Sequence, residues 1–174
     1  MQNPWKLVSS LGQSLWYDNI SRGFIASGGL QKMIAELDLR GVTSNPAIFE
    51  KAIAKSSEYD DDIRLLADQG KTTTEIYEKL TTDDIRNACD ILRTVYEATS
   101  GNDGFVSIEV DPRLAHTTDE TLEQARHLWK IVGRPNVMIK IPGTPAGLPA
   151  IRAAISEGIN VNVTLLFGIE NYAQ

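Results

Sequence analysis

Lys140 is the residue of this chain whose type and setting most strongly suggest chemistry. It lies in the run Val137-Met138-Ile139-Lys140-Ile141-Pro142, where apolar residues flank it on both sides. Burial in an apolar strand disfavours the ammonium form of lysine and favours the neutral amine, which can attack a carbonyl carbon. Lysine also occurs in strands as a guard against edge pairing between chains. The run alone therefore leaves both a Schiff-base nucleophile and an edge guard open.

Other strand-like runs carry polar residues at every second position or directly at their ends. These residues are Asp18, Thr43, Asn45, Ser107, Glu109, Asp111, Asn160, Asn162 and Thr164. A (β/α) barrel builds its active site from such positions, because the C-terminal ends of its strands converge over one mouth. A carbonyl-binding amine needs acids and bases that move protons and amides that hold hydroxyls. The shared polar face favours the nucleophile interpretation of Lys140.

Five strand-like runs alternate with helical patterns, which predicts βα units around a parallel sheet. The runs cover residues 15–18, 41–43, 105–110, 137–141 and 159–166. A solvent-facing antiparallel sheet would also alternate, but intervening helices favour parallel crossovers. We expect one domain over residues 1–174, with an insertion of two or three short helices at about 46–80.

Two helix starts are predicted from capping patterns. Thr117 with Glu120 forms a capping-box pattern ahead of an apolar stripe, and Thr81 or Thr82 precedes a helix over 85–96. The acidic run 58–62 lacks the alternating spacing of a calcium loop and is expected to be a solvated helix N-terminus. Cys89 shares an apolar helical stripe and is expected to pack in the core.

The composition narrows the class of partner. The 174 residues are 42% hydrophobic and 23% charged, which is ordinary for a globular domain. The net charge of −6, with no basic run, argues against nucleic acid and anionic membranes and favours a small-molecule ligand. A single cysteine and the absence of a membrane-length apolar stretch lead us to expect a cytoplasmic protein.

Four motifs, in this order, resemble the successive signatures of the transaldolase family. They are Val42-Thr43-Ser44-Asn45-Pro46-Ala47-Ile48-Phe49, Ile108-Glu109-Val110-Asp111-Pro112-Arg113, Met138-Ile139-Lys140-Ile141-Pro142-Gly143-Thr144 and Gly158-Ile159-Asn160-Val161-Asn162-Val163-Thr164-Leu165-Leu166-Phe167. The resemblance covers essentially the whole chain. The opening Leu15-Trp16-Tyr17-Asp18-Asn19-Ile20 is similar to the longer subtype, which is also found fused to glucose-6-phosphate isomerase.

The resemblance implies a (β/α)8 TIM barrel of the class I aldolase type, of which this chain supplies about five βα units. It also implies a transaldolase without metal or cofactor, acting in the pentose phosphate pathway. Such an enzyme transfers a dihydroxyacetone unit from sedoheptulose 7-phosphate or fructose 6-phosphate to an aldose phosphate. Its partners would be sugar phosphates.

The resemblance also assigns roles to individual residues. Lys140 would form the iminium, Asp18 would move the C4 hydroxyl proton, and Glu109 would move protons through a water positioned by Thr164. The residues expected to contact substrate are Thr43, Ser44, Asn45 and Asn162. Asn45 could equally cap the following helix. Asp111 and Arg113 are expected to form an ion pair.

The chain departs from the family in length. Five strands do not close an eight-stranded barrel, which takes about 250 residues, and the Ser- and Arg-bearing phosphate segment of the family is expected beyond residue 174. Open sheet edges favour self-association or completion by a C-terminal half-barrel. Two alternatives remain: another class I aldolase, similar to fructose-6-phosphate aldolase, and an inactive truncated half-barrel.

Overall fold

Five parallel strands form one sheet in the computed structural model, which describes residues 3–174. The strands are β1 (Leu15–Asp18), β2 (Leu39–Thr43), β3 (Phe105–Glu109), β4 (Val137–Pro142) and β5 (Val161–Thr164). Their spatial order follows the chain, and every neighbouring pair is parallel. The parallel sheet predicted from the alternating pattern is confirmed. β5 is shorter than expected at both ends.

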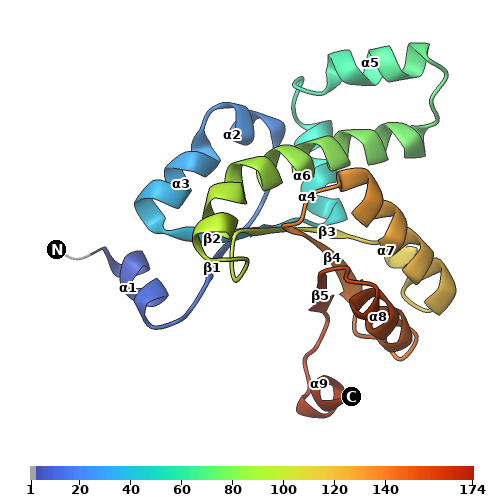
Figure 1. Ribbon diagram of the computed structural model, residues 1–174. Helices are drawn as coiled ribbons and strands as arrows, with labels where there is room; N and C mark the ends of the chain where they lie inside the picture. Colours follow the sequence, from blue (N-terminus) through green and yellow to red (C-terminus); the bar gives the residue numbers. More distant parts are fainter. Residues whose placement is uncertain (1–2) are drawn as a thin grey trace.

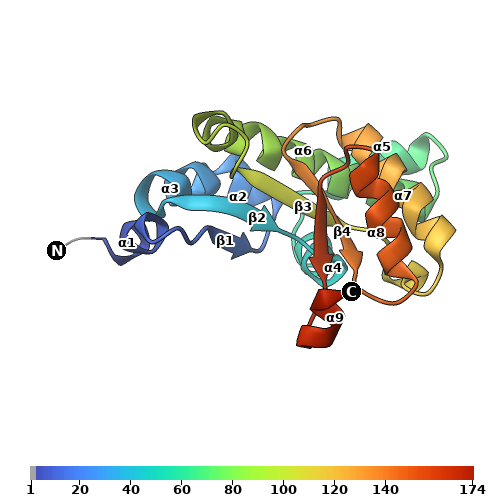
Figure 2. The same ribbon diagram turned by 60° about the horizontal axis from the view of Figure 1, so that its bottom comes forward.

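Helices alternate with the strands, and most of them cover one face of the curved sheet, whereas the last one projects from the end of β5 (Figures 1 and 2). They are α1 (Pro4–Ser10), α2 (Arg22–Ala26), α3 (Gly29–Leu37), α4 (Pro46–Ala54), α5 (Asp60–Asp68), α6 (Thr73–Ala98), the 3-10 helix η1 (Pro112–Leu114), α7 (Thr118–Val132), α8 (Gly147–Ser156) and α9 (Ile169–Ala173). The result is a half-barrel of βα units in which no helix among residues 3–174 forms a layer on the inner face.

The core lies between the outer face of the sheet and these helices. Val106 and Ile108 of β3 and Ile139 of β4 are at most 5% exposed, and they pack in one cluster with apolar residues of α6 and α7. Burying each such side chain contributes about 1.5–3 kcal/mol. Because side chains alternate along a strand, this outer core sends the intervening polar residues to the inner face.

Cys89 belongs to this core. Its side chain is fully buried on α6, as the apolar stripe predicted, and burial raises the pKa of its thiol to about 12. The thiol is therefore a packing group, since the thiolate is the reactive form.

The predicted helix start at Thr81 or Thr82 is wrong. The 26-residue helix α6 begins earlier, where Thr72 accepts from the Glu75 amide and the Glu75 carboxylate accepts from the Thr72 amide. Thr81 and Thr82 lie inside the helix, and their hydroxyls donate to carbonyls three and four residues back. Threonine in a helix interior makes this same backward bond, so a Thr-Thr-Asp-Asp sequence does not by itself mark a start.

The start of α7 is confirmed in position but not in mechanism. Thr117 is the N-cap residue, yet its hydroxyl donates to the Leu114 carbonyl and makes no cap bond. The helix ends at Gly133, whose φ of 60° lies in the left-handed region that favours glycine.

The acidic run does lie at a helix start, with Asp60, Asp61 and Asp62 in the first turn of α5. Asp62 also pairs with Arg22, which donates to the buried Asp84 of α6 at 3.1 Å. The Tyr59 hydroxyl donates to the other Asp84 oxygen at 2.7 Å and accepts from the Arg22 amide. This network fixes the segment that follows β1 against α6.

Candidate active site

Three polar residues of the inner face lie side by side on adjacent strands. Glu109 of β3 is in register with Lys140 of β4, which is in register with Asn162 of β5. Residues at one level of neighbouring parallel strands project to the same side of the sheet. The polar face predicted from the alternating pattern therefore exists around Lys140.

Lys140 is not an edge guard, because its strand is paired on both sides, with β3 and with β5. The residue is only 9% exposed. Its Nζ donates to the Ser44 carbonyl at 2.8 Å and lies 3.5 Å from Oε2 of Glu109. The amine thus reaches across β3 to the turn after β2, with a carboxylate beside it.

The turn that accepts the lysine is itself held in place. The Ser44 hydroxyl donates to the Ser107 carbonyl at 2.8 Å, and Ser44 is fully buried. Its side chain therefore has no free group on the inner face. The next residue, Asn45, caps α4 by accepting from the Ile48 amide at 3.0 Å, which confirms the capping prediction. Pro46 at the first helical position suits this start.

A second row of polar residues crosses β1, β2 and β3, and on β3 it lies on the N-terminal side of Glu109. Asp18 at the end of β1 is in register with Thr43 of β2, and Thr43 is in register with Ser107 of β3. Asp18 is exposed and Thr43 half-buried. β1 fits against β2 because the Trp16 ring covers Gly41, where a Cβ would meet the ring at 2.3 Å.

The polar residues in and directly before β5 have two different roles. Asn162 and Thr164 are half-buried on the inner face, and the Thr164 hydroxyl oxygen is buried without a hydrogen-bond partner among residues 3–174. Asn160 instead donates to the Pro135 and Val137 carbonyls at the opposite end of the sheet. The residues expected to act with Lys140 from β5 are thus Asn162 and Thr164.

The expected ion pair between Asp111 and Arg113 is confirmed. Arg113 Nε donates to both carboxylate oxygens at 2.9 Å, and these bonds lower the pKa of Asp111. Asp111 also caps η1 by accepting from the Arg113 amide. The bonds between these two residues therefore fix the conformation of the segment that follows β3.

Sequence reasoning missed two contributors to the site. Ser107 lies on the inner face and supplies the carbonyl that holds Ser44; the alternation along β3 had pointed to its side chain only. The Ser44 carbonyl, the direct partner of Lys140, is a main-chain group and leaves no signal in side-chain types.

The arrangement offers a buried primary amine, an adjacent carboxylate and further hydroxyl and amide groups on one open face. An amine with a nearby proton carrier is equipped for addition to a carbonyl. Among the described residues no group of three or more His, Cys, Asp or Glu side chains could hold a metal ion. No helix within residues 3–174 is long and apolar enough to cross a membrane.

Parallel βα units with a buried amine near the C-terminal end of a central strand are typical of (β/α) barrels, whose active sites lie at the strand ends. Residues 15–174 match the family described as Transaldolase/Fructose-6-phosphate aldolase. The chain belongs to this family.

The chain is similar to curated proteins named "Transaldolase" from three organisms. It is 56% identical to that of Trichodesmium erythraeum over 95% of this chain and 43% of the relative. It is 52% identical to that of Mycobacterium marinum over 98% and 46%, and 53% identical to that of Thermobifida fusca over 99% and 47%. The chain thus spans somewhat less than half the length of these relatives.

Proposed function

We propose that this chain carries the Schiff-base half of a transaldolase that acts on sugar phosphates in the pentose phosphate pathway, in the cytoplasm. The observation that supports this most directly is the Lys140 amine, held between the Ser44 carbonyl and the Glu109 carboxylate. Relatives that share 52–56% of its residues are named transaldolase.

The first stage is formation of the iminium. Lys140 Nζ gives up a proton and attacks C2 of a ketose phosphate, such as fructose 6-phosphate or sedoheptulose 7-phosphate. Glu109, 3.5 Å from the amine, is close enough to take that proton and to return one to the departing hydroxyl as water leaves. Thr164, whose hydroxyl has no partner among the described residues, orients a water for this exchange.

The second stage is carbon–carbon bond cleavage. The iminium nitrogen accepts the electron pair of the C3–C4 bond while Asp18 takes the C4 hydroxyl proton, so an aldose phosphate departs and an enamine remains on Lys140. The enamine then attacks the aldehyde of a second aldose phosphate, and Asp18 returns the proton. Thr43 orients Asp18, with which it is in register, and Asn45 and Asn162 hold substrate hydroxyls. We assign Ser44 to positioning the lysine.

The family description also includes fructose-6-phosphate aldolase. That activity would release free dihydroxyacetone rather than transfer it. The two are distinguished by whether erythrose 4-phosphate accepts the three-carbon unit.

Borohydride trapping with fructose 6-phosphate, followed by peptide mapping, tests the proposal. The reduced adduct is expected on Lys140 and absent from Lys140→Ala. The matched control is Lys130→Ala, which removes an exposed lysine from the last turn of α7. An adduct on another lysine, or none in a folded sample, would refute the assignment.

A further inference from the structure

A hollow lies beside the inner face that carries Lys140, at the C-terminal end of β3. It has a volume of about 470 Å³ and lies between α4, the N-terminal part of α6, α7 and the C-terminal end of β3. Lys140, Asp18, Asn162 and Thr164 do not line it, although Ser44, Asn45 and Glu109 border both places. The hollow therefore adjoins the candidate active site and shares three residues with it, but the Lys140 amine does not line it.

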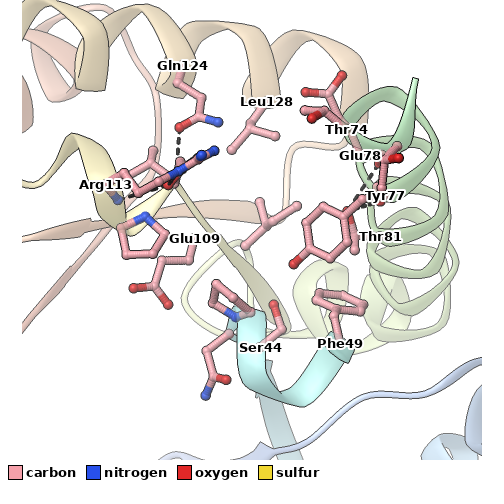
Figure 3. Close-up of a pocket in the computed structure, with 17 residues that line it drawn as sticks. Ser44, Phe49, Thr74, Tyr77, Glu78, Thr81, Glu109, Arg113, Gln124 and Leu128 are labelled. Atoms are coloured by element: carbon pink, nitrogen blue, oxygen red, sulfur yellow. Dashed lines mark hydrogen bonds and ion pairs between the residues drawn. The ribbon is translucent and has the colours of Figure 1, made fainter. Parts of the chain in front are cut away.

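The inner wall of the cavity is apolar and partly aromatic. Phe49, Leu128, Ile108 and Val110 are each at most 5% exposed there. The Tyr77 ring meets Phe49 nearly edge-on, with centroids 6.5 Å apart at 85°. Figure 3 shows these two rings on one side of the cavity and Gln124 and Leu128 on another. A volume of this size, with an apolar lining and a few polar groups, is typical of a small-molecule site.

The rim of the cavity is acidic. Glu78, Glu109 and Asp111 contribute carboxylates, and Arg113 is the one Lys or Arg residue among the lining residues. Each carboxylate has a neighbour: Arg113 bonds to Asp111, Lys140 lies beside Glu109, and His127 contacts Glu78 at 2.9 Å. Of these neighbours only Arg113 is a permanent cation. Glu78 is uncompensated when His127 is neutral, and Glu109 is uncompensated when Lys140 is the neutral amine that the proposed function uses.

The Tyr77 hydroxyl inside the cavity lies in the negative field of the rim carboxylates. Burial, followed by the carboxylates of Asp111, Glu109 and Glu50, raises the pKa of its hydroxyl. No hydrogen bond is recorded for that hydroxyl among the described residues, so its oxygen is free to accept from a ligand donor. A cation near a tyrosine ring and a carboxylate is stabilised by both, whereas an anion is repelled.

We propose that this cavity binds a small aromatic amine, with its ring against Phe49 and Tyr77 and its ammonium group at the acidic rim. An aromatic ring matches the edge-to-face geometry that the two side chains already show. The volume limits the ligand to one or two fused rings with a short amine arm.

Isothermal titration with tryptamine tests this proposal. Saturable binding with one site per chain is expected. Indole-3-propionate carries a similar ring system with a carboxylate on its arm, and it should bind at least about tenfold more weakly, a difference of about 1.4 kcal/mol. Equal or tighter binding of the carboxylate would contradict the role of the acidic rim.

Two rim substitutions locate the ligand. Thr74→Trp places a large ring at the mouth, and Tyr77→Ala removes one aromatic wall; both positions are exposed, so the fold is expected to persist. Each should weaken tryptamine binding by about tenfold or more. The matched control is Thr94→Trp, the same change at an exposed position of α6 that does not line the cavity, and it should bind as the parent does.

The failure of this site is separable from the failure of the proposed function. Asp18→Asn changes an active-site residue that does not line the cavity, so tryptamine binding should be unchanged, and a loss of binding in this variant would place the ligand in the active site instead. The proposal would be overturned if tryptamine binding did not saturate, or if folded Thr74→Trp bound tryptamine as the parent does. It would also be overturned if a peptide containing aromatic residues and lysine bound while tryptamine did not.

Discussion

The Lys140 side chain connects three strands. From β4 it passes the Glu109 carboxylate of β3 and donates to the Ser44 carbonyl after β2. An unpaired buried carbonyl costs about 1–3 kcal/mol, so replacing this lysine removes both a nucleophile and a structural bond. Trapping experiments on Lys140→Ala therefore need a check that the variant is folded.

Asp18 gives a residue-scale prediction that separates the two stages of the reaction. Asp18→Asn keeps a side chain of the same shape but cannot accept the C4 proton. Iminium trapping should continue at the parent rate, while turnover falls by roughly 10²–10⁴-fold, the usual contribution of a general base. The two measurements are borohydride trapping and transfer of the three-carbon unit to erythrose 4-phosphate. Both are made on a preparation in which the parent sequence is shown to catalyse the transfer. Equal loss of trapping and turnover would contradict the separation.

Single residues were predictable where side-chain type and alternation carried the signal. Lys140, Glu109 and Asn162 were expected on one face, and the strand register places them in one row. The partner of the lysine was less predictable, because it is the Ser44 carbonyl, and Ser44 is held in turn by the Ser107 carbonyl. Main-chain contacts depend on how strands are placed in space, which side-chain patterns do not encode.

At the scale of elements, the positions of the strands were predicted correctly, whereas the start of one long helix was not. The strands were found from their apolar alternation, since the helices bury one of their faces. The start of α6 was misplaced by nine or ten residues, because Thr81 and Thr82 resemble caps while bonding backward inside the helix. The true signal was the Thr72–Glu75 capping box, which lies in the stretch predicted as short helices.

Thr72→Ala gives the element-scale prediction. Loss of this cap should lower the free energy of unfolding by about 1 kcal/mol. Bonds from the Thr72 amide, the Lys71 side chain and the Thr72 hydroxyl lower the pKa of Glu75 from 4.5 to about 2. The variant loses the hydroxyl bond, so this pKa should rise, as measured by NMR titration. Thr94→Ala, at an exposed position inside the same helix, is the control and should be neutral or slightly stabilising.

The depressed pKa of Glu75 also sets a direction for the pH dependence of this helix start. The bonds favour the ionised carboxylate, so their contribution is fully present above pH 4.5 and is lost as the pH falls through about 2. The stability difference between Thr72→Ala and the parent should therefore narrow on acidification. A difference that grew toward low pH would contradict the assignment.

At the scale of the whole molecule, the described sheet has two open edges, at β1 and β5. Large apolar residues stand exposed in and around α9, beyond β5: Phe167 is 91% exposed and Ile169 is 88% exposed. Figure 2 shows α9 projecting from the end of β5, away from the helical layer. These relatives are about twice as long as this chain, so they contain further residues that are available to cover such an edge.

We predict that the 174-residue chain associates with itself through this edge when no other segment covers it. An open strand with apolar neighbours is a template for pairing with another chain. Size-exclusion chromatography with light scattering should show mass rising with concentration, and Phe167→Lys combined with Ile169→Lys should shift the population toward monomer. Leu65→Lys is the control, because Leu65 is 57% exposed on α5, remote from the sheet edge. A parent chain that stays monomeric at every concentration, or equal effects of the paired and control changes, would show that this edge is not the surface that associates.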